Sequence, residues 1–339
     1  MTTHARHLDA LPQTFEPTDE LAPPPWLESW LDDEITPAEF VCPETSTQQM
    51  TARIRRGPLA TLVSVRVQGA RQVRDGRFGD LTASAYALVR SALRDSALQA
   101  PAHRHVVRMW NFIPGIHDHM AGGEARYMTF NAGRFSALSD LHRGKAGIAA
   151  NAPAASGVGH LGTDLFIHAL AMERAGISVE NPAQIPAYHY SSRWGRVPPC
   201  FARATAINDE DRTLLISGTA AVIGEESVHD GDARAQWDAT INNISRVIEH
   251  ADTDGLIVPP RRVDHARIYM ARAEDEQSVR EWSRRSFPDS QTIEILSAQL
   301  CRSELLVEIE AVARVARKTA ATTSAGSSRT SSMTRRKYL

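Results

Sequence analysis

A carboxylate lies inside a stretch that otherwise has the pattern of a buried strand, and this strongly constrains how the chain can fold. The stretch is LLVEIEAVA, residues 305–313. Strand alternation places on one face Leu306, Glu308 and Glu310, and on the other Val307, Ile309 and, less regularly, Val312. A carboxyl group among apolar neighbours must be paired or protonated, and a protonated one can act as a general acid near neutral pH. Glu308 is therefore the leading catalytic candidate. The alternative is that both glutamates lie on the solvated face of an edge strand.

The composition is that of a globular protein with a large core. The chain has 339 residues, is 42% hydrophobic and has a formal net charge of −2, which indicates two domain-sized units and no footprint for nucleic acid. The sequence carries no signal for a membrane segment or for secretion. Its cysteines, Cys42, Cys200 and Cys301, have unrelated spacings that favour neither disulfides nor a metal pair, and so favour a reducing cytoplasm.

Both ends of the chain differ in composition from the body. Residues 1–50 are rich in Pro, Glu and Thr, and we interpret them as an irregular arm whose apolar side chains dock on the body: Trp26, Leu27, Trp30 and Leu31. Residues 318–339 contain Ser and Thr repeats and a final basic cluster, which predicts a disordered tail whose charge is solubilising.

The sequence pattern of the body predicts a similar order of strands and helices in each half of the chain. In the first half the apolar pattern predicts a strand, a helix, a strand, a helix and two strands near 59–67, 81–96, 105–113, 124–143, 147–155 and 163–173. In the second half, strands near 201–207 and 213–223 come before the same order: helix, strand, helix, strand and strand near 232–250, 266–271, 274–286, 292–300 and 305–315. This predicts an α/β (α+β) fold of two duplicated units, 51–185 and 186–317, with largely antiparallel sheets and packed helices. A chance match of short elements is the alternative.

Several familiar motif classes are absent or incomplete. No Gly-rich loop ends in Gly-Lys-Ser/Thr, and GVGHLG at 157–162 lacks the preceding strand and following helix of a dinucleotide fingerprint. The cluster His117-Asp118-His119 has too few partners at metal spacing, so no metal is predicted. Ser156 lacks the Gly-x-Ser-x-Gly pattern of a nucleophile elbow, which disfavours a serine hydrolase.

A set of arginines lies among apolar or aromatic neighbours in the sequence: Arg126, Arg134, Arg193, Arg203 and Arg272. A buried arginine needs an anion, and the planar guanidinium group suits carboxylates. Each arginine could instead pair with a local acid such as Asp140 or Glu124. Their occurrence together with an isolated strand glutamate favours a pocket that binds carboxylates.

Three segments of the second half form a pattern of their own: ISGTA at 216–220, Gln236 and Asn243 in the predicted helix, and VEIEA at 307–311. This pattern resembles the YjgF/RidA family, in which a glutamate of the last strand works in clefts between neighbouring units. The resemblance implies that both units have a YjgF/RidA-like (chorismate mutase-like) fold.

A longer ordered set of motifs extends from about residue 55 to 315. It consists of WNFIPGI at 110–116, Arg126-Tyr127 with Phe130 and Gly133-Arg134, PAASGVG at 153–159, YHY at 188–190, FARA at 201–204, and Cys301-Arg302. In this order the motifs are similar to those of the chorismatases, which remove pyruvate from chorismate and some of which carry an older label as pteridine-dependent dioxygenases. The chain departs from the family where Ala125 interrupts a Glu-Arg-Tyr triplet, where His117 replaces an asparagine, and after Tyr190.

The resemblance implies acid catalysis without a cofactor or metal, in a monomer with trimer-like internal pseudo-symmetry whose partner is a small-molecule substrate, and not a nucleic acid or membrane. Glu308 would protonate the enolpyruvyl methylene of chorismate. The implied substrate-binding residues are Arg126, Tyr127, Arg134, Tyr190, Arg203, Gly218, Arg272 and Cys301.

The resemblance leaves two routes by which pyruvate could depart. Water attack would give a dihydroxycyclohexadiene carboxylate, whereas displacement within the ring and aromatisation would give 3-hydroxybenzoate. In the family the second outcome goes with a cysteine seven residues before the catalytic glutamate, which is the position of Cys301. Cys301 could equally be a small apolar residue of a core strand. A RidA-like imine or enamine hydrolase and a non-catalytic metabolite-binding protein are further alternatives.

Overall fold

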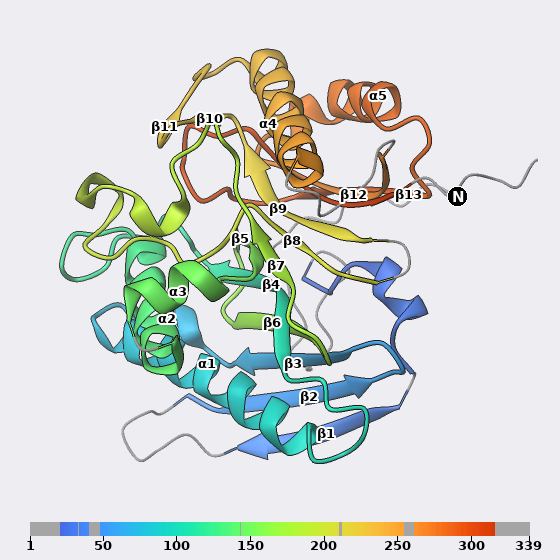
Figure 1. Ribbon diagram of the computed structural model, residues 1–339. Coiled ribbons are helices and arrows are strands. Elements are labelled where there is room, and N and C mark those ends of the chain that lie inside the picture. Colours follow the sequence, from blue (N-terminus) through green and yellow to red (C-terminus); the bar gives the residue numbers. More distant parts are fainter. Residues whose placement is uncertain are drawn as a thin grey trace, which may run out of the picture.

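The computed structural model describes residues 21–32, 34–40, 48–142, 144–209, 212–253 and 261–315. The predicted tail at 318–339 and the first part of the predicted arm lie outside these ranges. The described chain forms two six-stranded sheets that lie against each other, with helices on their outer faces (Figure 1). No helix in the described ranges is both long and apolar enough to span a bilayer.

The first sheet contains the strands of the N-terminal half. Its order is β1 (Ile35–Phe40), β2 (Met50–Arg56), β3 (Thr61–Val67), β6 (Leu165–Met172), β4 (His105–Pro114) and β5 (Ala154–His160). Helices α1 (Arg77–Ser96) and α2 (Arg126–His142) cover its outer face, and the short α3 (Lys145–Asn151) follows α2. Helix α1 buries one stripe at helical spacing, which fixes its packing on the sheet: Phe78, Leu81, Ala85, Leu88 and Ala92.

The second sheet repeats this topology. Its order is β7 (Ile177–Val179), β8 (Ala204–Ala206), β9 (Leu214–Ala220), β14 (Val307–Val315), β12 (Arg261–Met270) and β13 (Thr292–Ser297). Helices α4 (Ala233–Thr253) and α5 (Glu276–Ser286) cover its outer face. In each sheet one pair of strands is parallel, β4 with β5 and β12 with β13, and all other pairs are antiparallel. The prediction of two similar α/β units with largely antiparallel sheets is therefore confirmed.

The inner faces of the two sheets share one apolar core. Side chains from the first sheet, such as Trp110 and Phe112, pack there with Tyr269 and Val312 from the second. The predicted docking of the arm is confirmed, because Leu27, Trp30 and Leu31 are buried in the same core and Trp26 packs against it. Residues of the arm around 25–29 form a 3₁₀ helix, η1 (Pro25–Ser29).

The remaining elements are short. They are η2 (Ala70–Gln72), η3 (Ala187–His189), η4 (Ser192–Trp194), η5 (Ala273–Asp275), and the hairpin of β10 (Val222–Ile223) and β11 (Glu226–Ser227). Segments η3 and η4 and the hairpin lie around the cavity described below.

Three local predictions are wrong. The predicted strand at 147–155 begins as helix α3, because an alanine-rich run favours a helix until Pro153 forces the preceding Ala152 into an extended conformation. The arm is not irregular throughout, since β1 pairs with β2 at the edge of the first sheet, where a strand tolerates Pro37. Val312 belongs to the core between the sheets, on the side of Glu308 and Glu310.

The boundary proposed at residue 185 stays a prediction. Strand β7 already pairs with β8 of the second sheet, so the chain has entered that sheet by Ile177.

Candidate active site

A cavity of about 430 Å³ lies between the two units. Its wall combines the start of α2 and the loop before it, the η3 and η4 segments, β9, β10, the segment before β14, and β14 itself. Most of the predicted site residues line it: Tyr127, Tyr190, Arg203, Gly218, Cys301 and Glu308. Three predicted residues, Arg126, Arg134 and Arg272, are absent from the wall.

Glu308 lies on an inner strand and not on an edge, so the alternative of a solvated edge strand is wrong. β14 runs between β12 and β9, and Glu308 pairs with Tyr269 and Ala220. Its residue is only 4% exposed, and its carboxyl group makes no hydrogen bond within the described part of the chain. Burial, and then the negative charge of Glu310, raise the pKa of Glu308 to about 8 against the opposing charge of Arg108. A carboxyl with this pKa is protonated near neutral pH and can donate a proton into the cavity.

A bulge in β9 makes room for this carboxyl. The pairing of β9 with β14 shifts between Ile309 and Ala311, so that Ser217 and Gly218 together oppose Glu310. A Cβ atom on Gly218 would overlap Oε1 of Glu308. Glycine at this position is therefore what allows the Glu308 side chain to reach the cavity wall.

Arg203 brings a cation to the wall of the cavity. One of its terminal nitrogens donates to the carbonyl of Ile185 (3.0 Å) and to the hydroxyl of Tyr190 (2.7 Å). The guanidinium lies over the rings of Tyr190 and Phe201. Its Nε has no partner in the described part of the chain. Arg203 is thus pre-oriented and keeps an unused donor.

Arg302 is a second cation in the wall, which the sequence-based site did not include. Its guanidinium carbon is 3.3 Å from the centre of the Trp194 ring, and it donates to the carbonyl of Glu225 and the hydroxyl of Ser227. Its position next to Cys301 in the sequence was the feature that could have identified Arg302 as a site residue.

Arg134 lies near the cavity but not in its wall. It is buried, and its Nε and one terminal nitrogen have no partner among the described residues. Burial is the main reason that the pKa of Tyr127, which does line the cavity, is raised, and the charge of Arg134 opposes that rise. Arg134 therefore adds positive potential beside the cavity, and its role in binding stays a prediction.

Arg126 and Arg272 are held by other partners. Arg126 donates to the backbone carbonyls of Ala70, Arg71 and Val73, so it fastens α2 to η2 and is not part of the cavity wall. Arg272 is half-exposed and pairs with Asp275 at 2.9 Å. Backbone carbonyls hold the two terminal nitrogens of Arg126, whose Nε has no partner among the described residues, and a local acid pairs with Arg272. Neither arginine lies in the cavity wall, so their positions give no support to the prediction that they bind substrate.

Two further groups in the wall matter for the chemistry. Burial, and then the Glu308 charge, raise the pKa of the Cys301 thiol to about 12, so Cys301 is a neutral thiol and a poor nucleophile. Nε2 of His117 lies 2.7 Å from the carbonyl oxygen of Leu300. Because a carbonyl oxygen only accepts hydrogen bonds, Nε2 carries a proton and donates it to this oxygen in a hydrogen bond. His117, which departs from the family pattern, therefore ties the loop before α2 to the segment before β14.

Comparison with known proteins agrees with this geometry. Residues 41–171 match the family model described as chorismatase FkbO/Hyg5-like, N-terminal. A 3-hydroxybenzoate synthase of Streptomyces hygroscopicus is 35% identical over 70% of this chain and 70% of its own length. A chorismatase of Streptomyces rapamycinicus is 36% identical over 72% of each chain. A crystal structure of a chorismatase superposes with a TM-score of 0.67 and 32% identity, covering 77% of this chain and 76% of that one.

The chain belongs to the chorismatase family. The resemblance inferred from the ordered motifs is thereby confirmed, and the fold and the enzyme class are those of that family.

Proposed function

We propose that the protein removes pyruvate from chorismate by general-acid catalysis and forms 3-hydroxybenzoate. The observation that carries the proposal is a carboxyl group with a pKa of about 8 in the wall of a cavity that also presents guanidinium groups. Protonated Glu308 delivers its proton to the methylene carbon of the enolpyruvyl ether. The resulting oxocarbenium ion makes pyruvate a good leaving group, and one positioned acid contributes about 10²–10⁴-fold to the rate.

The cations of the wall bind the carboxylates of the substrate. Chorismate has a carboxylate on the ring and another on the enolpyruvyl group, and guanidinium groups suit both. Arg203 and Arg302 lie in the wall, and Arg134 adds charge beside it. Binding both ends of the substrate aligns the methylene carbon with Glu308, which is a second source of acceleration.

The product depends on which oxygen replaces the ether. If the neighbouring ring hydroxyl loses its proton and attacks the ether carbon, the ether bond breaks, pyruvate leaves and an epoxide forms on the ring. The epoxide oxygen then breaks its bond to the carbon that first carried it and takes up a proton, and loss of the proton from the former ether carbon gives 3-hydroxybenzoate with no net water consumed. If water attacks, one water is consumed and a dihydroxycyclohexadiene carboxylate forms. The similarity to a 3-hydroxybenzoate synthase and the presence of Cys301 in the wall support the first route. A wall that keeps water from the reacting carbon favours the internal nucleophile.

We also propose that the site works without a metal or cofactor. The chemistry requires one protein acid and carboxylate binding, and no step in it calls for a metal or cofactor. The proposal extends to a monomer as the active species, because the cavity with Glu308 in its wall lies between the two units of a single chain. The described free cysteines, Cys200 and Cys301, suit a reducing cytoplasm.

The test is incubation of the purified protein with chorismate, with pyruvate and the ring product quantified by chromatography. We expect equal amounts of pyruvate and 3-hydroxybenzoate. Binding of chorismate without pyruvate release would instead identify a metabolite-binding protein, and turnover of an imine in preference to chorismate would identify a RidA-like hydrolase.

A further inference from the structure

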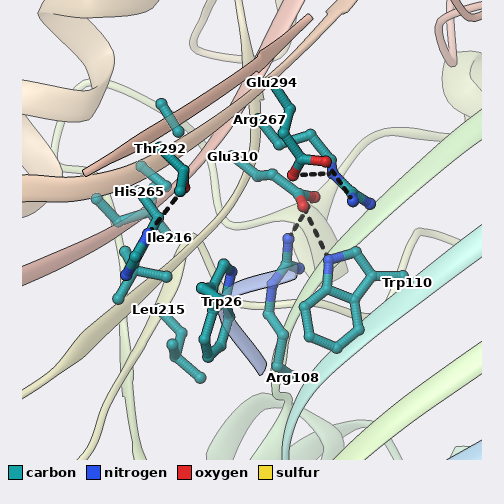
Figure 2. Close-up of a pocket in the computed structure, with 13 residues that line it drawn as sticks. Trp26, Arg108, Trp110, Leu215, Ile216, His265, Arg267, Thr292, Glu294 and Glu310 are labelled. Atoms are coloured by element: carbon teal, nitrogen blue, oxygen red, sulfur yellow. Dashed lines mark hydrogen bonds and ion pairs between the residues drawn. The ribbon is translucent and has the colours of Figure 1, made fainter. Parts of the chain in front are cut away.

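A second buried carboxylate, Glu310, lies on the same face of β14 as Glu308, in contrasting surroundings. One oxygen of Glu310 accepts a hydrogen bond from Arg108 (2.8 Å) and another from the hydroxyl of Ser156. The other oxygen accepts from the indole nitrogen of Trp110 (2.9 Å). Arginine and tryptophan can only donate, so both oxygens of Glu310 act as acceptors, as in a carboxylate anion. Figure 2 shows Arg108 and Trp110 pointing at this carboxylate.

The buried charges around Glu310 balance only if Glu308 is neutral. Arg108 pairs with Glu310, and Arg267 pairs with Glu294 through two bonds of 2.9 and 3.1 Å (Figure 2). Glu308 has no cation of its own among the described residues. An unpaired buried charge is costly, so Glu308 is the group that keeps its proton. The gap beside this cluster measures only about 10 Å³, so the cluster is a packed interior and not a second substrate site.

The cluster of Glu310, Arg108, Trp110 and Ser156 is linked to the cavity wall by hydrogen bonds. The hydroxyl of Ser156 accepts from Arg108 (2.6 Å) and from the backbone nitrogen of Gly218 (3.1 Å). Gly218 is the bulge residue against which the Glu308 carboxyl lies. A change at Glu310 therefore reaches Glu308 both along β14 and through Ser156 and Gly218.

We infer that Glu310, held by Arg108, Trp110 and Ser156, is a positioning residue that keeps Glu308 protonated and its carboxyl group at the cavity wall. The inference rests on the proposed function, because the role it assigns to Glu310 is in that reaction. A neighbouring negative charge in a water-poor interior opposes ionisation of Glu308, and Arg108, which pairs with Glu310, offsets this effect only in part.

Other ionisable groups face Glu308 from the elements packed around it. Tyr269 of β12 and Tyr127 of α2 have pKa values raised above their ordinary range, chiefly by burial, and the Cys301 thiol has one of about 12. These groups stay neutral where Glu308 titrates. His117, Glu304, Arg203 and Arg302 share the cavity wall. Burial raises the pKa of Glu180 to about 7, and the positive charge of Arg203 opposes this rise.

The experiment compares the pH dependence of kcat/KM for pyruvate release in matched variants. We expect Glu310→Gln to lower the midpoint of the alkaline limb by about one pH unit or more, which costs about tenfold in kcat/KM above the new midpoint. The double variant Arg108→Gln/Glu310→Gln should shift it less, because the opposing charge of Arg108 is removed as well. Glu294→Gln breaks the neighbouring arginine pair and is the control; its midpoint, like that of Glu180→Gln, should equal that of the wild type.

An unchanged midpoint in folded Glu310→Gln, or an equal shift in Glu294→Gln, would overturn the inference. If circular dichroism shows that Glu310→Gln does not fold, the double variant decides: a midpoint equal to that of the wild type contradicts the role of Glu310. The titration of Glu308 can also be followed without turnover, as the infrared carbonyl band that is lost in Glu308→Gln. A wild type that releases no pyruvate would refute the proposed function, whereas the infrared midpoint in Glu310→Gln would still decide the inference.

Discussion

The two halves of the molecule share one topology, but their central strands differ in chemistry. In the first sheet the strand between β3 and β4 is β6, LFIHALAM, whose ionisable residue is His168. Both ring nitrogens of His168 are occupied, Nε2 donating to the carbonyl of Leu21 and Nδ1 accepting from the hydroxyl of Ser64. The corresponding strand of the second sheet, β14, carries Glu308 and Glu310. His168 thus ties the docked arm to the first sheet, whereas the Glu308 carboxyl of the second sheet has no hydrogen-bond partner among the described residues, which suits the proposed acid catalysis.

The first unit nevertheless supplies the side chains that hold Glu310, the neighbour of Glu308 on β14. Arg108, Trp110 and Ser156 all belong to β4 and β5 of the first sheet, and they hold Glu310 of the second. In the proposed mechanism, one of the two similar halves therefore supplies the acid and the other supports it.

The largest expected effect separates the two central strands directly. Glu308→Gln keeps the shape of the side chain and removes the transferable proton, so we expect pyruvate release to fall by about 10²–10⁴-fold with the fold intact. His168→Gln, the matched change in β6, should retain most activity in steady-state kinetics. Wild-type rates from a folded Glu308→Gln protein would remove Glu308 from the mechanism.

A smaller effect is expected where the two units meet the substrate. Arg203→Ala removes a cavity cation and should lower kcat/KM by about 10–100-fold, mainly through KM, since a charge-assisted bond to a carboxylate is lost. Arg272→Ala, in which a locally paired arginine of the same unit is removed, is the control and should leave the kinetics unchanged. Equal kinetics in both variants would make Arg203 a structural residue.

The sequence predicted those features of the site that depend on residues close together in the chain. The alternation around Glu308 marked a buried carboxyl, and the ordered motifs located Tyr127, Arg203 and Cys301. The support of Glu310 was not predictable, because its partners Arg108 and Ser156 lie far away in the chain and meet it only across the two sheets. For the same reason the sequence did not show the partners of Arg126, which are backbone carbonyls that no residue pattern marks.

Strand β1 was missed for a related reason. Its short sequence with a proline has no strong strand pattern, and its conformation comes from pairing with β2.

The two central strands should respond to pH with opposite signs. The folded state binds the proton of Glu308 up to a pKa of about 8, so between about pH 4.5 and 8 stability falls as pH rises. Burial lowers the pKa of His168 to about 4, so between about pH 4 and 6.5 stability falls as pH drops. In thermal unfolding we expect Glu308→Gln to gain about 4 kcal/mol over wild type at pH 8 and about 1 kcal/mol or less at pH 5. A stability difference that does not vary with pH would contradict the assigned protonation of Glu308.

The smallest effect concerns the product. Cys301→Ala opens the wall near the reacting carbon, so the share of the dihydroxycyclohexadiene carboxylate should rise a few-fold at the expense of 3-hydroxybenzoate. Chromatography of both products gives the ratio, and Cys200→Ala, a buried cysteine outside the cavity wall, is the control. An unchanged ratio in Cys301→Ala would reduce Cys301 to a packing residue.

The pH dependence of kcat/KM for pyruvate release by the wild type tests most directly whether Glu308 acts as an acid. Measured from about pH 5 to about pH 10, the rate should be level below neutrality and fall about tenfold per unit above a midpoint near the Glu308 pKa of about 8. A rate that instead rises through the same range would identify a group that must be ionised to work, and would contradict the assignment of Glu308 as the proton donor.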